Sequence, residues 1–196
     1  MLGTAGPLVP TDSLLDAGLV MNDASTRTPC AGAKTDPAAL RAALGQFATG
    51  VTIVTTIGPQ GQPIGLTANS FTSVSLEPPL VLWSLSKRSA SLELFCNAGS
   101  FAINVLSSDQ HALCRRFAQR MEGDRFEGVP LAPSQYGLPL IEGTLAAFEC
   151  ATHAQYDAGD HIMFLGRVQH YTATGGDALI FHAGRMSAST DSVEWH

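Results

Sequence analysis

Polar side chains that could hold a ligand gather in residues 65–91, GLTANSFTSVSLEPPLVLWSLSKRSAS. The first half of this stretch is rich in small hydroxyl and amide groups, namely Thr67, Asn69, Ser70, Thr72, Ser73 and Ser75. The second half ends in serines around two cations, and its candidate phosphate ligands are Ser84, Ser86, Lys87, Ser89 and Ser91. This order suits a ligand with a flat polar ring at one end and a phosphate at the other. Serine-rich segments beside strands also form solvated turns, so the residue types alone leave that alternative open.

His161 is a second candidate for chemistry. It follows Gly159 and Asp160, which favour a tight turn between two long strand-like segments. A residue at the tip of a hairpin has no core to fill, and such positions more often face a site or a partner. We therefore expect a functional role for His161, with a hairpin cap as the alternative.

Several catalytic motifs are incomplete. The glycines of GQFATG (residues 45–50) have the spacing of a phosphate loop, but Val51 and Thr52 stand where lysine and a hydroxyl residue are required. The segment SLSK (residues 84–87) matches S-x-x-K, whereas the companion K-T-G is missing. The sequence contains no G-x-G-x-x-G, which argues against a dehydrogenase of the dinucleotide-binding fold.

Composition favours one globular domain with small-molecule partners. The chain has 196 residues, 45% hydrophobic and 14% charged, which predicts a large buried fraction or a subunit interface. A net charge of −6 without a basic stripe argues against nucleic acid as a partner. The cysteines are widely spaced, show no metal-binding pattern, and are expected to be reduced thiols of a cytoplasmic protein: Cys30, Cys96, Cys114 and Cys150. No apolar run approaches the roughly 20 residues of a membrane span, and we expect no export signal.

Local patterns predict a mainly β, antiparallel domain over residues 36–196, preceded by a flexible extension over residues 1–35. Asp36 and Pro37 are suited to opening a helix that closes near Gly50 and has an apolar face. Further helices are expected at 90–97 and 108–120, and strands at 51–57, 64–71, 80–85, 101–106, 145–156, 162–171 and 178–182. Because several strands are joined by hairpins and no alternating βαβ pattern occurs, we expect an antiparallel β-barrel with helical crossings.

Collinear motifs then point to a family. The runs FATGVTIVTT (47–56), GLTANSFTSVSLEPPLVL (65–82) and GSFAINVL (99–106) resemble the flavin reductase-like family, the reductase components of two-component flavin monooxygenases. The motifs DRF (124–126) and GDH (159–161) and residues 143–150 continue the resemblance in the same order. The similarity covers about residues 36–186.

The resemblance implies a homodimeric, FMN-binding split β-barrel that oxidises NADH or NADPH, reduces FMN or FAD, and supplies a separate monooxygenase. Flavin contacts of the family correspond here to Pro63, Ile64, Gly65, Leu66, Thr67, Asn69, Ser70, Ser84, Leu85, Ser86, Ala90, Ser91, Arg116 and Phe117. From the residue types, Lys87 joins the phosphate end. No metal site is implied.

The nicotinamide side of the family corresponds here to Asp160, His161, Phe181, His182, Ala183 and Gly184. His161 is the candidate catalytic residue. Many relatives have arginine where this chain has Ala183, so the preferred nucleotide stays open. Arg185 is one residue beyond Gly184 and could compensate.

Other functions stay open from the residues alone. The same barrel could carry a flavin or haem without catalysis, or it could reduce ferric iron through flavin. FMN against FAD, NADH against NADPH, and the oxygenase partner are also undetermined.

Overall fold

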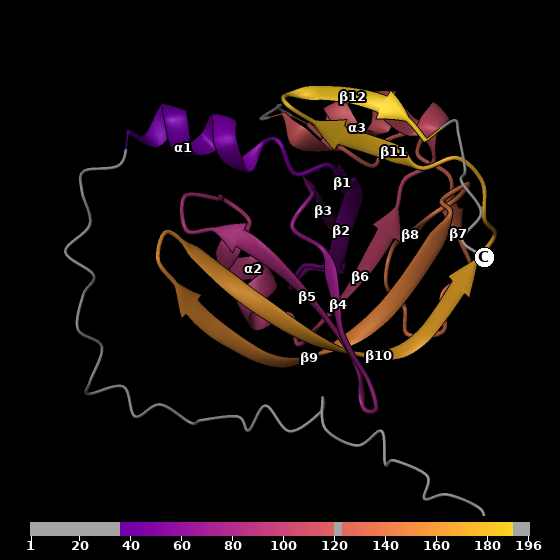
Figure 1. Ribbon diagram of the computed structural model, residues 1–196. Helices are drawn as coiled ribbons and strands as arrows, with labels where there is room; N and C mark the ends of the chain where they lie inside the picture. The colour runs from indigo at the N-terminus through magenta and orange to yellow at the C-terminus, as the bar shows by residue number, and fades with distance from the viewer. Residues whose placement is uncertain (1–35, 120–122, 190–196) are drawn as a thin grey trace, which may run out of the picture. The chain divides into compact units, whose positions relative to one another are not determined.

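Antiparallel strand pairing organises the computed structural model, which describes residues 36–119 and 123–189 (Figure 1). The helices are α1 (Pro37–Leu44), α2 (Leu92–Asn97), η1 (Ser108–Gln110, a 3₁₀ turn) and α3 (His111–Ala118). The first strands are β1 (Thr49–Gly50), β2 (Thr52–Ile57), β3 (Pro63–Ala68), β4 (Thr72–Leu76), β5 (Pro79–Ser86) and β6 (Ser100–Val105). The later strands are β7 (Leu131–Ala132), β8 (Leu140–Ile141), β9 (Ala146–Ala158), β10 (His161–Ala173), β11 (Leu179–His182) and β12 (Arg185–Ala188).

The main sheet has seven strands in the order β3-β2-β6-β9-β10-β5-β4, and neighbouring strands all pair antiparallel. A small sheet, β1-β11-β12, and the pair β7-β8 accompany it. β3 and β4 are the two ends of the main sheet, yet the chain between them is short. Ser70, in that connection, hydrogen-bonds both backbone groups of Ser84 on β5, and so ties the β3 end to the other half of the sheet.

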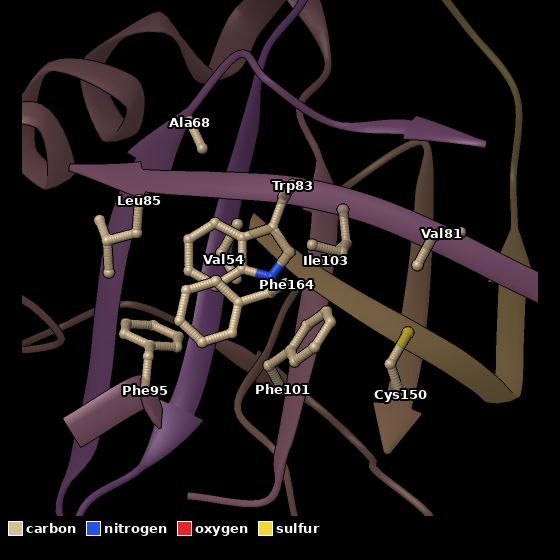
Figure 2. Packing of buried hydrophobic residues seen from close by; sticks show 10 residues of the cluster. All are labelled: Val54, Ala68, Val81, Trp83, Leu85, Phe95, Phe101, Ile103, Cys150 and Phe164. Carbon is tan, nitrogen blue, oxygen red and sulfur yellow. The ribbon is translucent and has the colours of Figure 1, made fainter. Parts of the chain in front are cut away.

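The core is built around Trp83, which is fully buried on β5 (Figure 2). Its ring stacks on that of Phe164, with centroids 4.7 Å apart and planes at 15°, and Phe95 and Phe101 meet it edge-on. Burying each such side chain contributes about 1.5–3 kcal/mol relative to leaving it exposed. Pairs of aromatic rings in these geometries add about 0.5–1.5 kcal/mol beyond the buried area. This cluster fixes β5 against β10 and α2.

Glu149 is the one carboxylate buried in the core of the described ranges, and it has a structural role. It accepts hydrogen bonds from the Ser134 hydroxyl and from the amides of Gln135 and Tyr136, and His170 lies 3.3 Å away. Burial alone would raise the pKa of this carboxyl, but the hydrogen bonds and His170 outweigh it and the pKa lies below its usual value. Glu149 thus holds the segment after β7 against β9.

The first helix is shorter than predicted. α1 ends at Leu44, and the expected apolar face is solvent-exposed, with Leu44 66% and Phe47 77% exposed. The chain turns at Gly45, whose carbonyl accepts a hydrogen bond from the Ala183 amide at 2.8 Å. β1 then pairs with β11. Long-range pairing therefore ends a helix that the local pattern would extend to Gly50.

Five strands were not expected from the sequence, namely β1, β4, β7, β8 and β12. β4 occupies part of the hydroxyl-rich run and forms a hairpin with β5 across a turn that holds the cis Glu77–Pro78 peptide. β12 pairs with β11 across the two residues Ala183 and Gly184, both with positive φ. The predicted helix at 108–120 is divided into η1 and α3. The remaining predicted strands and α2 are present within a few residues of their expected bounds.

The structure also bears on the expected thiols and membrane spans. Cys96, Cys114 and Cys150 are free thiols, and burial is the main cause that raises the pKa of Cys150 to about 12. Within the two described ranges, no helix is long and apolar enough to cross a membrane. The cytoplasmic location stays a prediction. The expected flexible extension and Cys30 lie outside the described residues, and the boundary near residue 36 stays a prediction.

Candidate functional site

The register of β5 on β10 decides which side chains can share a site. Trp83 lies opposite Phe164, Ser84 opposite Met163, and Ser86 opposite His161. Successive side chains of a strand point to opposite faces, and directly paired residues share a face. Because the Trp83–Phe164 pair faces the core, the pairs Ser84–Met163 and Ser86–His161 face the other side.

A hollow of about 540 Å³, the His161 hollow, opens on that other face. It lies between β3 with its following turn on one wall and the ends of β5 and β10 on the other. Predicted flavin contacts line it together with His161: Leu66, Thr67, Asn69, Ser70, Ser84, Leu85 and Ser86. Ala68, Ala158 and Met163 complete the lining, so the structure brings the candidate catalytic histidine to the predicted flavin residues.

Two further hollows continue from the first along β3. The Ser91 hollow, of about 240 Å³, shares Leu66, Thr67 and Leu85 with the His161 hollow. Its remaining lining residues are Ser89, Ala90, Ser91, Phe117, Ala118 and Arg125. The Gln62 hollow, of about 430 Å³, shares Ser91 and Arg125 with it and is otherwise lined by Gln62, Pro63, Ile64, Gly65, Gly123, Asp124 and Phe126. The three hollows therefore lie next to one another along β3, and this row of hollows is called the groove below.

Two hydroxyls predicted to contact the ligand already have protein partners. The Thr67 hydroxyl donates to the Cys114 carbonyl of α3 at 2.7 Å. The Ser70 hydroxyl donates to the Ser84 carbonyl and accepts from the Ser84 amide. A hydroxyl has one proton to donate, so both residues retain only acceptor capacity for a ligand. Their visible role is to hold α3 and β5 against β3 and to set the width of the groove.

At Gly65 the lack of a side chain lets two aromatic rings pack against the backbone of β3. A Cβ built on this glycine would lie 2.8 Å from the ring of Phe117 and 2.9 Å from that of Phe126. These two rings pack edge-to-face, 4.9 Å apart, over the glycine. Any side chain at Gly65 would displace them, and Phe117 lines the Ser91 hollow while Phe126 lines the Gln62 hollow.

Arg125 is a groove residue that was not predicted from the sequence. Its guanidinium donates to the Gly65 carbonyl at 3.0 Å and to the Gln119 carbonyl at 2.7 Å. It lines both the Ser91 hollow and the Gln62 hollow. In the sequence, Arg125 is distinguished only by its place in the DRF motif (residues 124–126), and the motif assigns it no role.

The two cations that were selected have other partners. The Lys87 ammonium lies 2.7 and 2.9 Å from the two carboxylate oxygens of Asp157. Arg116 donates to the carbonyls of Asp124 and Glu127 at 3.1 and 2.7 Å and so holds the loop after α3. Neither residue is among those that line the three hollows. Their roles at the ligand stay predictions.

His161 lies at the start of β10, directly after the β9–β10 turn, as the sequence predicted. Its Nδ1 is 2.7 Å from Asp160 Oδ1, and its side chain is 43% exposed. The hydrogen bond from His161 and its positive charge when protonated lower the pKa of Asp160. With Nδ1 oriented toward the carboxylate, Nε2 is the nitrogen left for another partner. Across residues 36–119 and 123–189, no group of three or more His, Cys, Asp or Glu side chains could hold a metal ion.

The other predicted nicotinamide residues lie on the β11–β12 hairpin. Phe181 packs against the core cluster that contains Phe117 and Leu179, and His182 pairs with Arg185. Ala183 has φ +46° at the turn, a conformation that glycine and asparagine adopt more readily than other residues. No residue from 181–184 is among the lining of the His161 hollow, so their contact with nicotinamide stays a prediction.

Comparison with known proteins agrees with this architecture. The family model described as flavin reductase like domain matches residues 44–190. The FMN reductase (NADH) SmoA of Agrobacterium fabrum is 49% identical over 144 residues, which are 74% of this chain and 81% of SmoA. The reductase component of the flavin-dependent trigonelline monooxygenase of Acinetobacter baylyi is 46% identical over 158 residues, but they span only 51% of that protein.

Solved structures show the same fold. The NADH:FAD oxidoreductase SgcE6 of Streptomyces globisporus, in complex with NAD and FAD fragments, superposes with a TM-score of 0.76 at 38% identity. The match covers 83% of this chain and all of SgcE6. The predicted fold class, a mainly β, antiparallel split barrel with helical crossings, is confirmed. The chain belongs to the flavin reductase-like family.

Proposed function

We propose that this protein is an NAD(P)H:flavin oxidoreductase that reduces FMN or FAD and supplies the reduced flavin to a separate monooxygenase. The observation that carries the proposal is the row of hollows along β3, which has His161 in its first hollow and Arg125 in the two that follow. Support also comes from relatives named as an NADH-dependent FMN reductase, as an NADH:FAD oxidoreductase and as a monooxygenase reductase component.

The donor set fits a flavin. Leu66 and Leu85 give the middle of the groove apolar walls that a planar ring and its ribityl chain can contact. Ser84 and Ser86 face the His161 hollow, where polar groups are needed at the edge of the ring. Ser89, Ser91 and Arg125 offer hydroxyl and guanidinium donors at the other end.

The chemistry itself belongs to the bound cofactors, since hydride transfer between nicotinamide and flavin needs no protein acid or base on the carbon. This chain's residues hold the ring, exclude water and orient the incoming nucleotide. His161 is positioned for the last task because its imidazole borders the hollow and is steadied by Asp160. Rate depends steeply on the geometry of the reacting atoms, so an orienting contact has a large effect.

The function is tested by steady-state oxidation of NADH and of NADPH, with FMN, FAD or no added flavin. We expect nucleotide oxidation that depends on flavin and, without oxygen, bleaching of the flavin absorbance by the nucleotide. Binding of flavin without bleaching would instead identify a non-catalytic carrier. Reduction of a ferric chelate without added flavin would favour the ferric reductase.

Replacement of His161 tests its role. We expect His161→Ala to raise the KM for NADH, or to slow anaerobic flavin reduction by about ten-fold or more, while the flavin Kd stays unchanged. Reduction by dithionite should be unaffected, because dithionite needs no nicotinamide site. His153→Ala, an exposed histidine on β9, is the matched control. Normal NADH kinetics together with a lower Tm would show that His161 only caps the hairpin.

A homodimer is the second part of the proposal. Large apolar side chains are exposed on α1, on the turn after it and on β4, where Leu40, Leu44, Phe47, Val74 and Leu76 lie. Leu76 is 91% exposed, and water contact with such groups favours burial against another chain. Sedimentation velocity at micromolar concentration should give twice the monomer mass of 20.6 kDa. A fully active species of 20.6 kDa would contradict the dimer.

A further inference from the structure

We propose that Arg125 is the cation that binds the flavin phosphate, in the Ser91 hollow. The inference rests on the proposed function and deepens it, because it assigns the phosphate end of the same groove to a residue on the loop after α3. The residue types alone had pointed to Lys87 for this role.

The first step is the geometry of the guanidinium. Arg125 is half-buried, and two of its N–H groups are held by the carbonyls of Gly65 and Gln119. These two hydrogen bonds fix the plane of the guanidinium beside β3. A guanidinium has five N–H donors, so three remain beyond the two hydrogen bonds described. A planar, pre-oriented fork of this kind suits the oxygens of a phosphate.

The positive charge of Arg125 has no carboxylate partner among the described residues. Among the ion pairs formed within the described ranges, none involves Arg125. Lys87, in contrast, has both carboxylate oxygens of Asp157 within 2.9 Å, and that carboxylate already offsets its charge. A phosphate gains more from a cation without a carboxylate partner than from one that must first leave its partner. The available positive charge in the groove is therefore that of Arg125.

The polar groups on the two sides of Arg125 place the phosphate on one side of it. Asp124 lines the Gln62 hollow, where its carboxylate accepts the Phe126 amide at 2.8 Å and would repel a phosphate. It does not line the Ser91 hollow, where Ser89 and Ser91 add hydroxyl groups. The Ser91 side chain makes no capping hydrogen bond to α2. The phosphate thus belongs with the serines, one hollow away from His161.

The test compares the affinity for FMN with that for riboflavin, which has the same ring but no phosphate. In the wild-type chain FMN should bind more tightly than riboflavin. Arg125→Gln should weaken FMN by about ten-fold to a hundred-fold, the usual range for hydrogen bonds to charged groups, and leave the riboflavin Kd unchanged. Fluorescence titration without nicotinamide nucleotide gives both values. Unchanged riboflavin binding also shows that the variant is folded.

Lys87→Gln is the matched control and should leave the ratio of the two Kd values unchanged. Arg125→Lys should restore part of the FMN preference, since charge is kept without the fork. Rising salt should weaken FMN binding in the wild type more than in Arg125→Gln.

Three outcomes would overturn the assignment. In the first, Arg125→Gln keeps the wild-type preference for FMN, or Lys87→Gln loses it. In the second, Arg125→Gln weakens FMN and riboflavin equally, which would mean that Arg125 only shapes the groove. In the third, Arg125→Gln raises the KM for NADH and leaves the Kd for FMN unchanged, which would assign Arg125 to the phosphates of NADH. A wild-type chain that binds no flavin would overturn the proposed function itself, and a flavin-binding chain with any of these three results would overturn Arg125 alone.

Discussion

The pairing of β5 with β10 is the constraint on which the site depends. Trp83 and Phe164 lie opposite each other in this ladder and stack in the core. The alternation of side chains then leaves Ser86 and His161 opposite each other on the other face. A slip of one residue would turn Trp83 out of the core, so the aromatic stack fixes the register of the site at the same time.

The second wall of the groove depends on the absence of a side chain. At Gly65 the rings of Phe117 and Phe126 come closer to β3 than any Cβ would permit, and Arg125 binds the same glycine's carbonyl. Thr67, two residues further along β3, holds α3 by donating a hydrogen bond to the Cys114 carbonyl. Two segments far apart in the sequence, β3 and the stretch of α3 with residues 125 and 126, thus meet, and the groove lies where they meet.

Local sequence patterns predicted where helices and strands form better than they predicted which distant residues those elements and side chains contact. The hairpin that carries His161 and the buried strand around Trp83 follow from turn residues and an apolar run, which are local signals. The end of α1 and the strands β4 and β12 depend on pairing with distant residues, which local patterns do not contain. Lys87 was selected because cations beside serines suit a phosphate. Its contact with Asp157, 70 residues away, is visible only in three dimensions. The place of Arg125 in the groove is likewise invisible in the sequence, because it depends on the carbonyl of Gly65, 60 residues earlier.

The central claim is that flavin occupies the groove along β3, between His161 and Arg125. Amide hydrogen exchange with and without FMN tests it directly. FMN in the groove should slow amide exchange in peptides from residues 63–70, 84–91 and 158–163. Residues of the segment 131–139 line a neighbouring hollow of about 440 Å³ together with Ile57, Gly61 and Pro63, and neither His161 nor Arg125 is among its lining residues. This segment should exchange at the same rate in both states. Protection confined to residues 131–139, with none along β3 and β5, would contradict the account.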